Sequence, residues 1–115
     1  MGRVLINLEG VFYSCKHCNT DLAHASQFLL EESFGGRHGR TYLFNNVVNV
    51  TFGEQEEREM MGGLHTVVDI FCFKCGSNVG WKFLSAQQQT EEYKVGKFIL
   101  KRSLLQMWVP AAAAN

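Results

Sequence analysis

The hydrophobic positions of this chain recur mainly at every second residue, the spacing typical of β-strands, and only rarely at helical intervals. Alternation over residues 4–8, followed by the turn-forming pair Glu9 and Gly10, predicts an N-terminal hairpin with residues 11–13. Runs rich in β-branched and aromatic side chains predict further strands at residues 41–44, 47–52, 64–73, 79–83 and 97–100. The pattern therefore predicts a mainly β fold.

The segments between these strands have other patterns. Residues 21–34 carry apolar side chains at mixed intervals, which predicts a short helix or irregular chain. Three glycines within residues 35–39 predict a loop. The charged run at residues 54–59 predicts a solvated connection or one turn of helix, and residues 110–115 are expected to form a frayed tail.

Composition narrows the class of protein. The 115 residues are 46% hydrophobic and 19% charged, which is typical of a single compact domain. Eleven Lys and Arg balance eleven Asp and Glu, so the chain lacks the excess positive charge that drives non-specific binding to nucleic acid. No apolar run approaches the roughly 18 residues of a membrane span. Because the first residues lack the apolar core of a secretory signal, we expect a soluble protein in the reducing cytosol or nucleus.

All four cysteines fall into two Cys-x-x-Cys pairs, Cys15 with Cys18 and Cys72 with Cys75. A Cys-x-x-Cys turn directs both thiolates to one side, and two such turns complete the tetrahedral sulfur set that suits Zn²⁺. Each pair follows a predicted strand and precedes an apolar return strand, so the chain is expected to contain two similar knuckles facing each other. The sequence therefore predicts one structural zinc ion that closes a long loop.

The cysteine pattern has three other possible uses. A thioredoxin-like dithiol requires a Cys-x-x-Cys that opens a helix, and two disulfides do not fit a reducing compartment. An iron–sulfur cluster is also held by four cysteine thiolates, so iron–sulfur binding stays open as an alternative to zinc. A four-thiolate zinc site has no open position for substrate, and the chain has no spare cysteine and no recognisable nucleophile or phosphate-loop motif. We therefore expect a protein that is not an enzyme.

One pair of aromatic residues allows two interpretations. Trp81 and Phe83 lie two residues apart on a predicted strand, so both side chains project from the same face. Together with His65 or Tyr42 they could line an open pocket for a small ligand. The alternative is that this face is the core beneath the knuckles, where aromatic side chains supply most of the buried area.

Two groups of basic residues are expected to face solvent. The first is a glycine-rich loop that could hold a phosphate, and the second is a C-terminal cluster that would solubilise a sheet edge. Their members are Arg37, His38 and Arg40 in the loop, and Lys94, Lys97, Lys101 and Arg102 in the cluster.

Several short motifs occur in the order and spacing of a known family. They are Cys15-x-x-Cys18, Tyr42-Leu43-Phe44, Val68-Asp69-Ile70, Cys72-x-x-Cys75, Gly80-Trp81-Lys82 and the run from Tyr93 to Phe98. On these motifs the chain resembles the Yippee-like proteins over residues 11–108. The resemblance is closest to the plant members, chiefly through Arg37-His38-Gly39 and the run from Gly63 to Asp69.

The resemblance implies a fold of the tent-like type, two antiparallel sheets pinned by one four-cysteine zinc site. Similar folds are those of the thalidomide-binding domain of cereblon and the B-type methionine-sulfoxide reductases. The reductases use a catalytic cysteine besides their zinc ligands, and this chain has none, so that activity is not expected here. Because Trp81 and Phe83 match the final Trp-x-Phe of the cereblon-type aromatic cage, a small cyclic ligand or modified peptide is a possible alternative ligand.

The resemblance also implies a function. Members of the family are small nuclear or cytoplasmic proteins linked to cell division, growth and stress signalling. We therefore expect a protein-interaction module, an adaptor or scaffold, formed by a Yippee domain over residues 11–108. An N-terminal strand or extension over residues 1–10 and a flexible tail over residues 109–115 are expected to flank it.

Overall fold

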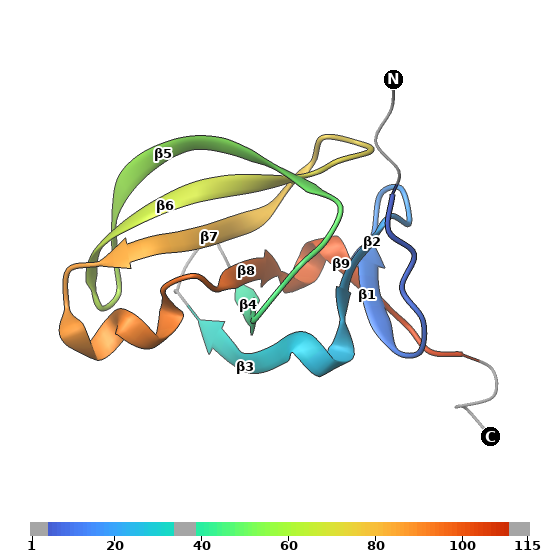
Figure 1. Ribbon diagram of the computed structural model, residues 1–115, viewed down its shortest axis with the longest axis horizontal. Coiled ribbons are helices and arrows are strands. Elements are labelled where there is room, and N and C mark those ends of the chain that lie inside the picture. Colours follow the sequence, from blue (N-terminus) through green and yellow to red (C-terminus); the bar gives the residue numbers. More distant parts are fainter. Residues whose placement is uncertain (1–4, 34–38, 111–115) are drawn as a thin grey trace.

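The computed structural model describes residues 5–33 and 39–110, which form two antiparallel sheets (Figure 1). The smaller sheet has the strand order β2-β1-β9 and lies at the end where both termini emerge. Its strands are β1 (Phe12–Cys15), β2 (Asp21–His24) and β9 (Leu105–Trp108). A strand from the chain's end is thereby paired with one from its beginning.

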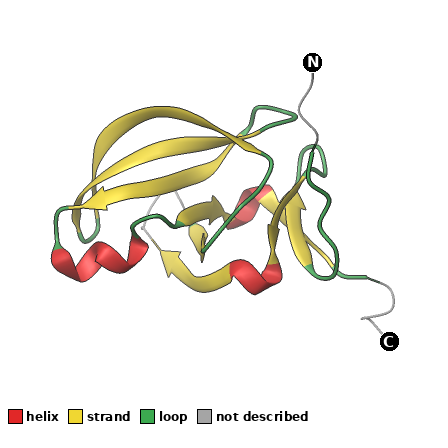
Figure 2. Ribbon diagram, viewed as in Figure 1, coloured by secondary structure: helices red, strands yellow, loops and turns green. Residues whose placement is uncertain are grey.

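The larger sheet has six strands in the order β3-β4-β8-β7-β6-β5. Its members are β3 (Phe28–Ser33), β4 (Arg40–Phe44), β5 (Val50–Met60), β6 (Gly63–Cys72), β7 (Asn78–Ala86) and β8 (Phe98–Lys101). Within the described residues, three short 3₁₀ helices connect strands (Figure 2): η1 (Ala25–Gln27), η3 (Gln89–Lys94) and η4 (Arg102–Leu104). None of the described helices has the length and apolar character needed to cross a membrane. The prediction of a mainly β fold is confirmed.

Buried side chains form two clusters, one on each face of the larger sheet. The first cluster fills the space between the sheets, because it joins Tyr13 and Leu22 of the smaller sheet to Phe44 and Ile70 of the larger. The second cluster holds Leu43, Val67, Trp81, Phe83 and Ile99. Neighbouring residues on a strand point to opposite faces, so this second set packs on the side of the larger sheet that faces away from the smaller one.

One glycine lets two strands approach closely. A Cβ atom on Gly80 of β7 would lie 1.7 Å from the backbone oxygen of Ile99 on β8. Side chains never come that close to a backbone oxygen, so only glycine fits this position without moving β7 away from β8.

The predicted N-terminal hairpin is wrong. Residues 5–9 form no strand, and β1 pairs instead with β2 and β9. Side chains from distant parts of the chain hold the segment: the Ile6 N–H donates to Asn49 Oδ1 at 2.9 Å, and the Leu8 N–H donates to Asp21 Oδ2 at 2.8 Å. The alternation in the sequence is real, but side chains rather than a neighbouring strand satisfy this backbone.

Two further segments differ from the sequence-based expectation. Residues 21–34 were expected to be helical or irregular, but they contain β2, η1 and β3, and the mixed spacing arises because η1 separates two strands. The charged run at 54–59 continues β5 as an edge strand rather than forming a connection. Arg58 explains part of this, since its guanidinium bonds to Glu56 at 2.7 Å and crosses to Asp69 of β6 at 2.8 Å.

Some predictions fall outside the described residues. They concern Arg37 and His38 of the glycine-rich loop and the tail beyond residue 110. The strands predicted at residues 64–73, 79–83 and 97–100 correspond to β6, β7 and β8.

Candidate metal centre

The two Cys-x-x-Cys turns have the same backbone geometry. In the first, the Cys15 N–H donates to the Thr20 carbonyl at 2.8 Å, and in the second the Cys72 N–H donates to the Ser77 carbonyl at 2.8 Å. The residue after each second cysteine has a positive φ, 64° at Asn19 and 77° at Gly76. Both residue types adopt this left-handed conformation readily. The structure thus contains the two similar knuckles that the sequence predicts.

The knuckles bring all four sulfurs together. The four Sγ atoms lie within 4.8 Å of one another. Cys15 Sγ is 3.7 Å from Cys75 Sγ, and Cys18 Sγ is 3.4 Å from Cys72 Sγ. A regular tetrahedron with metal–sulfur distances of about 2.3 Å separates its sulfurs by about 3.8 Å. The cluster therefore fits a single tetrahedral metal ion held by two ligands from each knuckle.

The same geometry argues against two of the other uses of these cysteines. The bonded sulfurs of a disulfide lie about 2.05 Å apart, and these four cysteines are free. Neither pair opens a helix. The first pair lies at the turn from β1 to β2, and the second lies at the turn from β6 to β7. The arrangement fits a four-thiolate metal centre, in which the four sulfurs would fill a tetrahedral coordination shell.

Two hydroxyl groups that the sequence analysis did not single out contact the sulfurs. Thr20 Oγ1 lies 3.0 Å from Cys18 Sγ, and Ser77 Oγ lies 3.2 Å from Cys75 Sγ. Both residues stand two positions after the second cysteine of their pair. A hydroxyl at this shared offset, Cys-x-x-Cys-x-Thr or Ser, is the signal that could have found them. Such partners orient metal ligands and tune their basicity.

The four thiols ionise very differently when no ion is bound. Burial raises the pKa of Cys15 to about 12 and also raises the pKa of Cys72. Hydrogen bonding with Ser77 lowers the pKa of the exposed Cys75 to about 6. Burial also opposes ionisation of Cys18, but hydrogen bonds with Thr20 outweigh it and lower its pKa. Each knuckle therefore pairs one buried, protonated thiol with one more acidic thiol.

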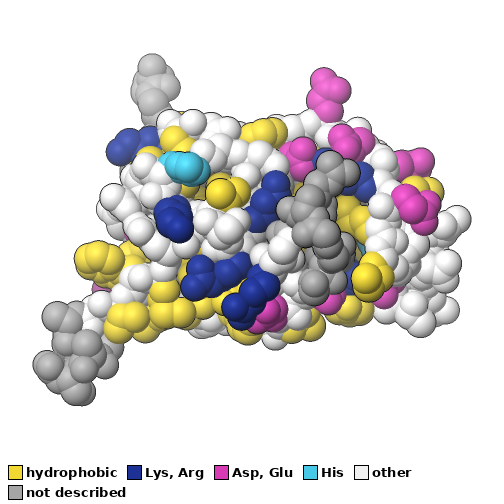
Figure 3. All heavy atoms as spheres, turned by 180° about the vertical axis from the view of Figure 1, so that it is seen from behind, with side chains coloured by type: hydrophobic (Ala, Val, Ile, Leu, Met, Phe, Trp, Pro, Cys, Tyr) yellow, Lys and Arg dark blue, Asp and Glu magenta, His cyan; other side chains and the backbone are white. Residues whose placement is uncertain are grey.

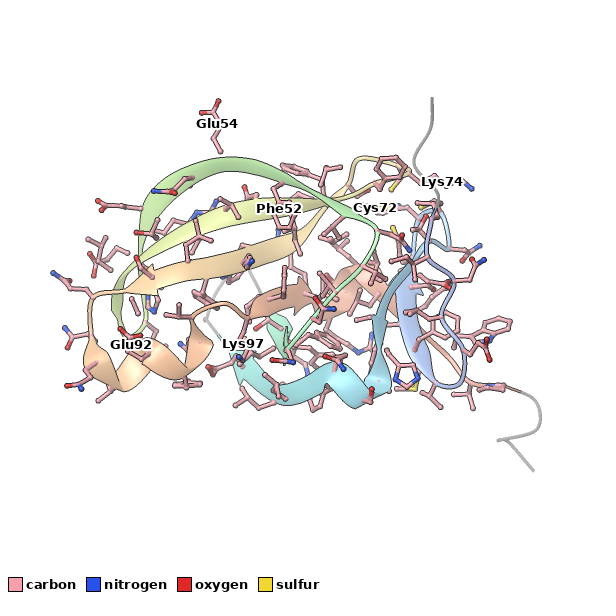
Figure 4. All side chains as sticks on the ribbon, in the orientation of Figure 1. Phe52, Glu54, Cys72, Lys74, Glu92 and Lys97 are labelled. Atoms are coloured by element: carbon pink, nitrogen blue, oxygen red, sulfur yellow. The ribbon has the colours of Figure 1, made fainter. Side chains whose placement is uncertain are left out.

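The metal centre lies where the two sheets meet. Cys72 and Lys74 sit at the end of β6 next to the turn that joins β1 to β2 (Figure 4). Lys74 is exposed, whereas Cys72 is 1% exposed and belongs to the cluster between the sheets. An ion at this position would tie the smaller sheet to the larger one.

The four candidate pocket residues do not line an open pocket together. Trp81 and His65 are each 1% exposed and Phe83 is fully buried, with the His65 and Phe83 rings 5.2 Å apart. Tyr42 lies on the other face of the sheet, where its ring meets that of Tyr13 at 5.8 Å. Trp81 and Phe83 therefore belong to the second core cluster, which agrees with the core interpretation of this face.

A buried ion cluster beside this core is also absent from the sequence-based expectations. Lys94 was placed in a solubilising cluster, but it is 3% exposed, and its Nζ lies 2.5 Å from Glu91 and 3.5 Å from Glu32. Its Nζ also lies 5.6 Å from the Phe83 ring centre. His65 Nε2 is 3.7 Å from the same Glu91 carboxylate. The cluster closes one side of the second core rather than facing solvent.

Comparison with known proteins places these features in context. The family model described as "Yippee zinc-binding/DNA-binding /Mis18, centromere assembly" matches residues 11–113. A yippee-like protein of Arabidopsis thaliana is 55% identical over 103 residues, covering 89% of this chain and 80% of the relative. A yippee-like protein of Solanum tuberosum is 54% identical over 89% of this chain and 79% of its own length. Human yippee-like 4 is 48% identical over 79% of this chain and 71% of its length.

A solved structure shares the fold. The crystal structure of the Mis18 "Yippee-like" domain aligns with a TM-score of 0.70, covering 90% of this chain and 99% of that one, at 14% identity. The similarity at this identity concerns the fold, and it agrees with two antiparallel sheets joined at a cysteine cluster.

Proposed function

This chain belongs to the Yippee-Mis18 family of zinc-binding domains, and from that premise we propose that it is a non-enzymatic protein-interaction module held in shape by one zinc ion. The adaptor or scaffold role would lie in growth, cell-division or stress signalling, in the nucleus or cytoplasm. Zinc suits this cluster because its filled d shell imposes no geometric preference. A structural zinc ion also takes all four of its ligands from the protein, as the four sulfurs here would supply. The ion would supply folding energy rather than chemistry.

The observation that carries the proposal is a set of large apolar side chains left exposed at one end of the molecule. Met107, Trp108 and Val109 are 54%, 57% and 45% exposed. Figure 3 shows hydrophobic side chains gathered at the end from which the C-terminal residues leave, while acidic side chains gather at the opposite end. Met107 and Trp108 are neighbours on β9 and project from opposite faces of the sheet, so both faces of this edge expose apolar surface of the kind that marks interaction sites.

A ligand sensor and a DNA-binding protein have less support. A sensor at Trp81 and Phe83 would need these rings to line a pocket, but both are almost fully buried and belong to the second core cluster. The family description includes DNA binding, but the zero net charge of this chain gives little of the phosphate attraction on which such binding depends. A protein partner remains the proposal that the surface supports best.

Quantitative capture from native extract tests this function. Zinc-loaded wild-type protein should retain a reproducible set of proteins that Cys72→Ser, with its metal centre broken, does not retain. A retained protein should then bind the purified domain directly in solution. The proposal fails if no such direct binder is found. It also fails if the purified protein turns over a substrate, for example if it reduces methionine sulfoxide with a thiol reductant.

A further inference from the structure

A cleft lies on the outer face of the smaller sheet, on the side away from the core. Its volume is about 310 Å³, and its lining is Phe12, Ser14, Asn19, Asp21, Gln106 and Trp108. Ligand pockets for drug-sized molecules begin at about 300 Å³, so this cleft suits one side chain rather than a whole cofactor. It shares no lining residue with the metal centre or with the buried rings around Trp81.

Strand pairing explains how the cleft is built. Phe12 and Ser14 of β1 form the floor, since alternate residues of a strand share a face and Tyr13 and Cys15 point into the core. Gln106 and Trp108 of β9 stand beside them, in register with Ser14 and Phe12 respectively. An amide bridge from Gln106 to Asn19 spans from β9 to the β1–β2 turn. The bridge closes the end of the cleft nearest to the metal centre.

The cleft combines aromatic faces with a carboxylate. The Phe12 and Trp108 rings lie 6.2 Å apart and are tilted by 31°. Asp21, the one charged residue of the lining, accepts a hydrogen bond from the Leu8 N–H and makes no ion pair with any described residue. A cation is attracted to an aromatic face when it lies within about 6 Å of the ring centre, and a carboxylate attracts a cation as well. The cleft therefore suits a positively charged group on an apolar stem. Lysine has that chemistry.

The strand that forms one wall of the cleft also has a free edge. On the other side of the smaller sheet, the edge of β2 is occupied, because the Val48 N–H donates to the Leu22 carbonyl and Asn49 Nδ2 donates to the Asp21 carbonyl. β9 pairs with β1 on one edge, and no described strand lies along its other edge. An extended peptide can add to such an edge, with alternate side chains on the outer face.

We propose that β9 and the adjoining cleft bind an extended peptide segment of a partner protein, whose lysine side chain lies over the Trp108 ring with its ammonium group directed across the cleft toward the Asp21 carboxylate. The proposal rests on the proposed function, for which it names the surface and the chemistry of the partner. Charge complementarity selects this occupant over an acidic or purely apolar peptide. A second copy of the chain on the same edge is an alternative that the test separates.

The test uses two short probe peptides and the intact zinc-loaded protein. The first is an acetylated and amidated pentapeptide of threonine, valine, lysine, valine and threonine, and the second carries norleucine in place of lysine. Binding is followed by the indole N–H resonance of Trp108 in a ¹⁵N-labelled sample. The indole of Trp81, buried at 1% exposure, serves as an internal reference for the fold.

Two variants and two matched controls locate the binding. Trp108→Ala removes the ring, and its control Met107→Ala removes a neighbour of similar exposure, 54% against 57%, that does not line the cleft. Asp21→Asn removes the charge but keeps an oxygen for the Leu8 N–H, and its control Glu9→Gln makes the same charge change outside the lining. Because Trp108→Ala has no indole at this position, peptide binding to that variant is followed by the backbone resonances of β9.

The lysine peptide should shift the Trp108 indole and bind at least about fivefold more tightly than the norleucine peptide. Trp108→Ala and Asp21→Asn should each weaken binding of the lysine peptide by about threefold to tenfold, and neither control should change this affinity by more than about twofold.

Equal binding of both peptides, no binding, or undiminished binding to either variant overturns the proposal. Concentration-dependent dimerisation of the wild type that Trp108→Ala abolishes also overturns it, because a second copy then occupies the edge. If the peptide test fails while a direct protein binder is still captured by Trp108→Ala, the interaction function stands and only this surface is wrong.

Discussion

Replacing one buried sulfur ligand should release the metal and unfold the domain together. Cys72→Ser is the sharpest change, because Cys72 is 1% exposed and belongs both to the sulfur cluster and to the core between the sheets. Serine keeps the size of the side chain but offers an oxygen that zinc binds far less well in such a site. The change therefore removes one ligand with little loss of packing.

The chain topology sets the magnitude of the effect. The two knuckles are separated by residues 19–71, and cross-linking the ends of a loop of roughly 50 residues removes about 4 kcal/mol of unfolded-state entropy. A domain of this size has a free energy of unfolding of about 5–15 kcal/mol. Because each kcal/mol corresponds to about 4 °C or more, Cys72→Ser should lower the melting temperature by at least about 15 °C.

Elemental analysis and thermal melts followed by circular dichroism test this together. The wild type should carry one zinc per chain, and the serine variant should carry much less and melt early. Lys74→Ala is the matched control, since it changes an exposed residue between Cys72 and Cys75 and leaves every ligand in place. A Cys72→Ser protein that lacks metal but melts with the wild type would refute the view that the ion holds the fold.

Three further predictions concern the core, the strand pairing and the thiols. Trp81→Ala should lose about 3–5 kcal/mol in a denaturant titration, whereas the exposed Trp108→Ala should lose less than about 1 kcal/mol; equal losses would contradict the core role. Gly80→Ala should lose about 3 kcal/mol, since its Cβ would meet the Ile99 oxygen at 1.7 Å, and a neutral result would contradict the close approach. Burial raises the pKa of Cys15 to about 12, so that thiol holds its proton at neutral pH and the ion must displace it. Zinc affinity, measured by chelator competition, should therefore rise with pH by about tenfold or more per unit, and a flat profile would contradict this.

The metal centre was predictable from the sequence because its geometry is local. Each Cys-x-x-Cys turn is fixed within six residues, by a bond such as that from the Cys15 N–H to the Thr20 carbonyl and by a left-handed residue such as Asn19. The meeting of the two knuckles is non-local. We could still predict that the two knuckles meet, because two pairs of thiolates together complete the tetrahedral ligand set of one zinc ion.

The wrong predictions share a dependence on distant residues. The segment around Ile6 was assigned a strand partner next to it in the sequence, but Asn49, 43 residues away, supplies its hydrogen bonds. Lys94 was expected on the surface because it clusters in the sequence with Lys97, Lys101 and Arg102, and only the fold brings Glu32 and Glu91 to its ammonium group. The burial of the Trp81 ring likewise depends on residues from other strands, such as Leu43 and Ile99, which the sequence does not place beside it.

Strand β1 links the metal centre to the cleft on the outer face, which gives a last prediction. Cys15 and Tyr13 point into the core, while Phe12 and Ser14 form the cleft floor, so one four-residue strand serves both sites. The pairing of Cys15 with Leu105 and the bond from the Lys16 N–H to the Leu104 carbonyl at 2.9 Å set β9 against that strand. Removing zinc with a chelator should therefore abolish binding of the lysine peptide, and saturating peptide should raise the affinity for zinc, because coupling between the affinities of two sites is reciprocal. Zinc affinity measured by equilibrium competition with a colorimetric chelator tests this, with the norleucine peptide as control. A zinc affinity that the lysine peptide leaves unchanged at saturation would show that the cleft does not depend on the position of β1.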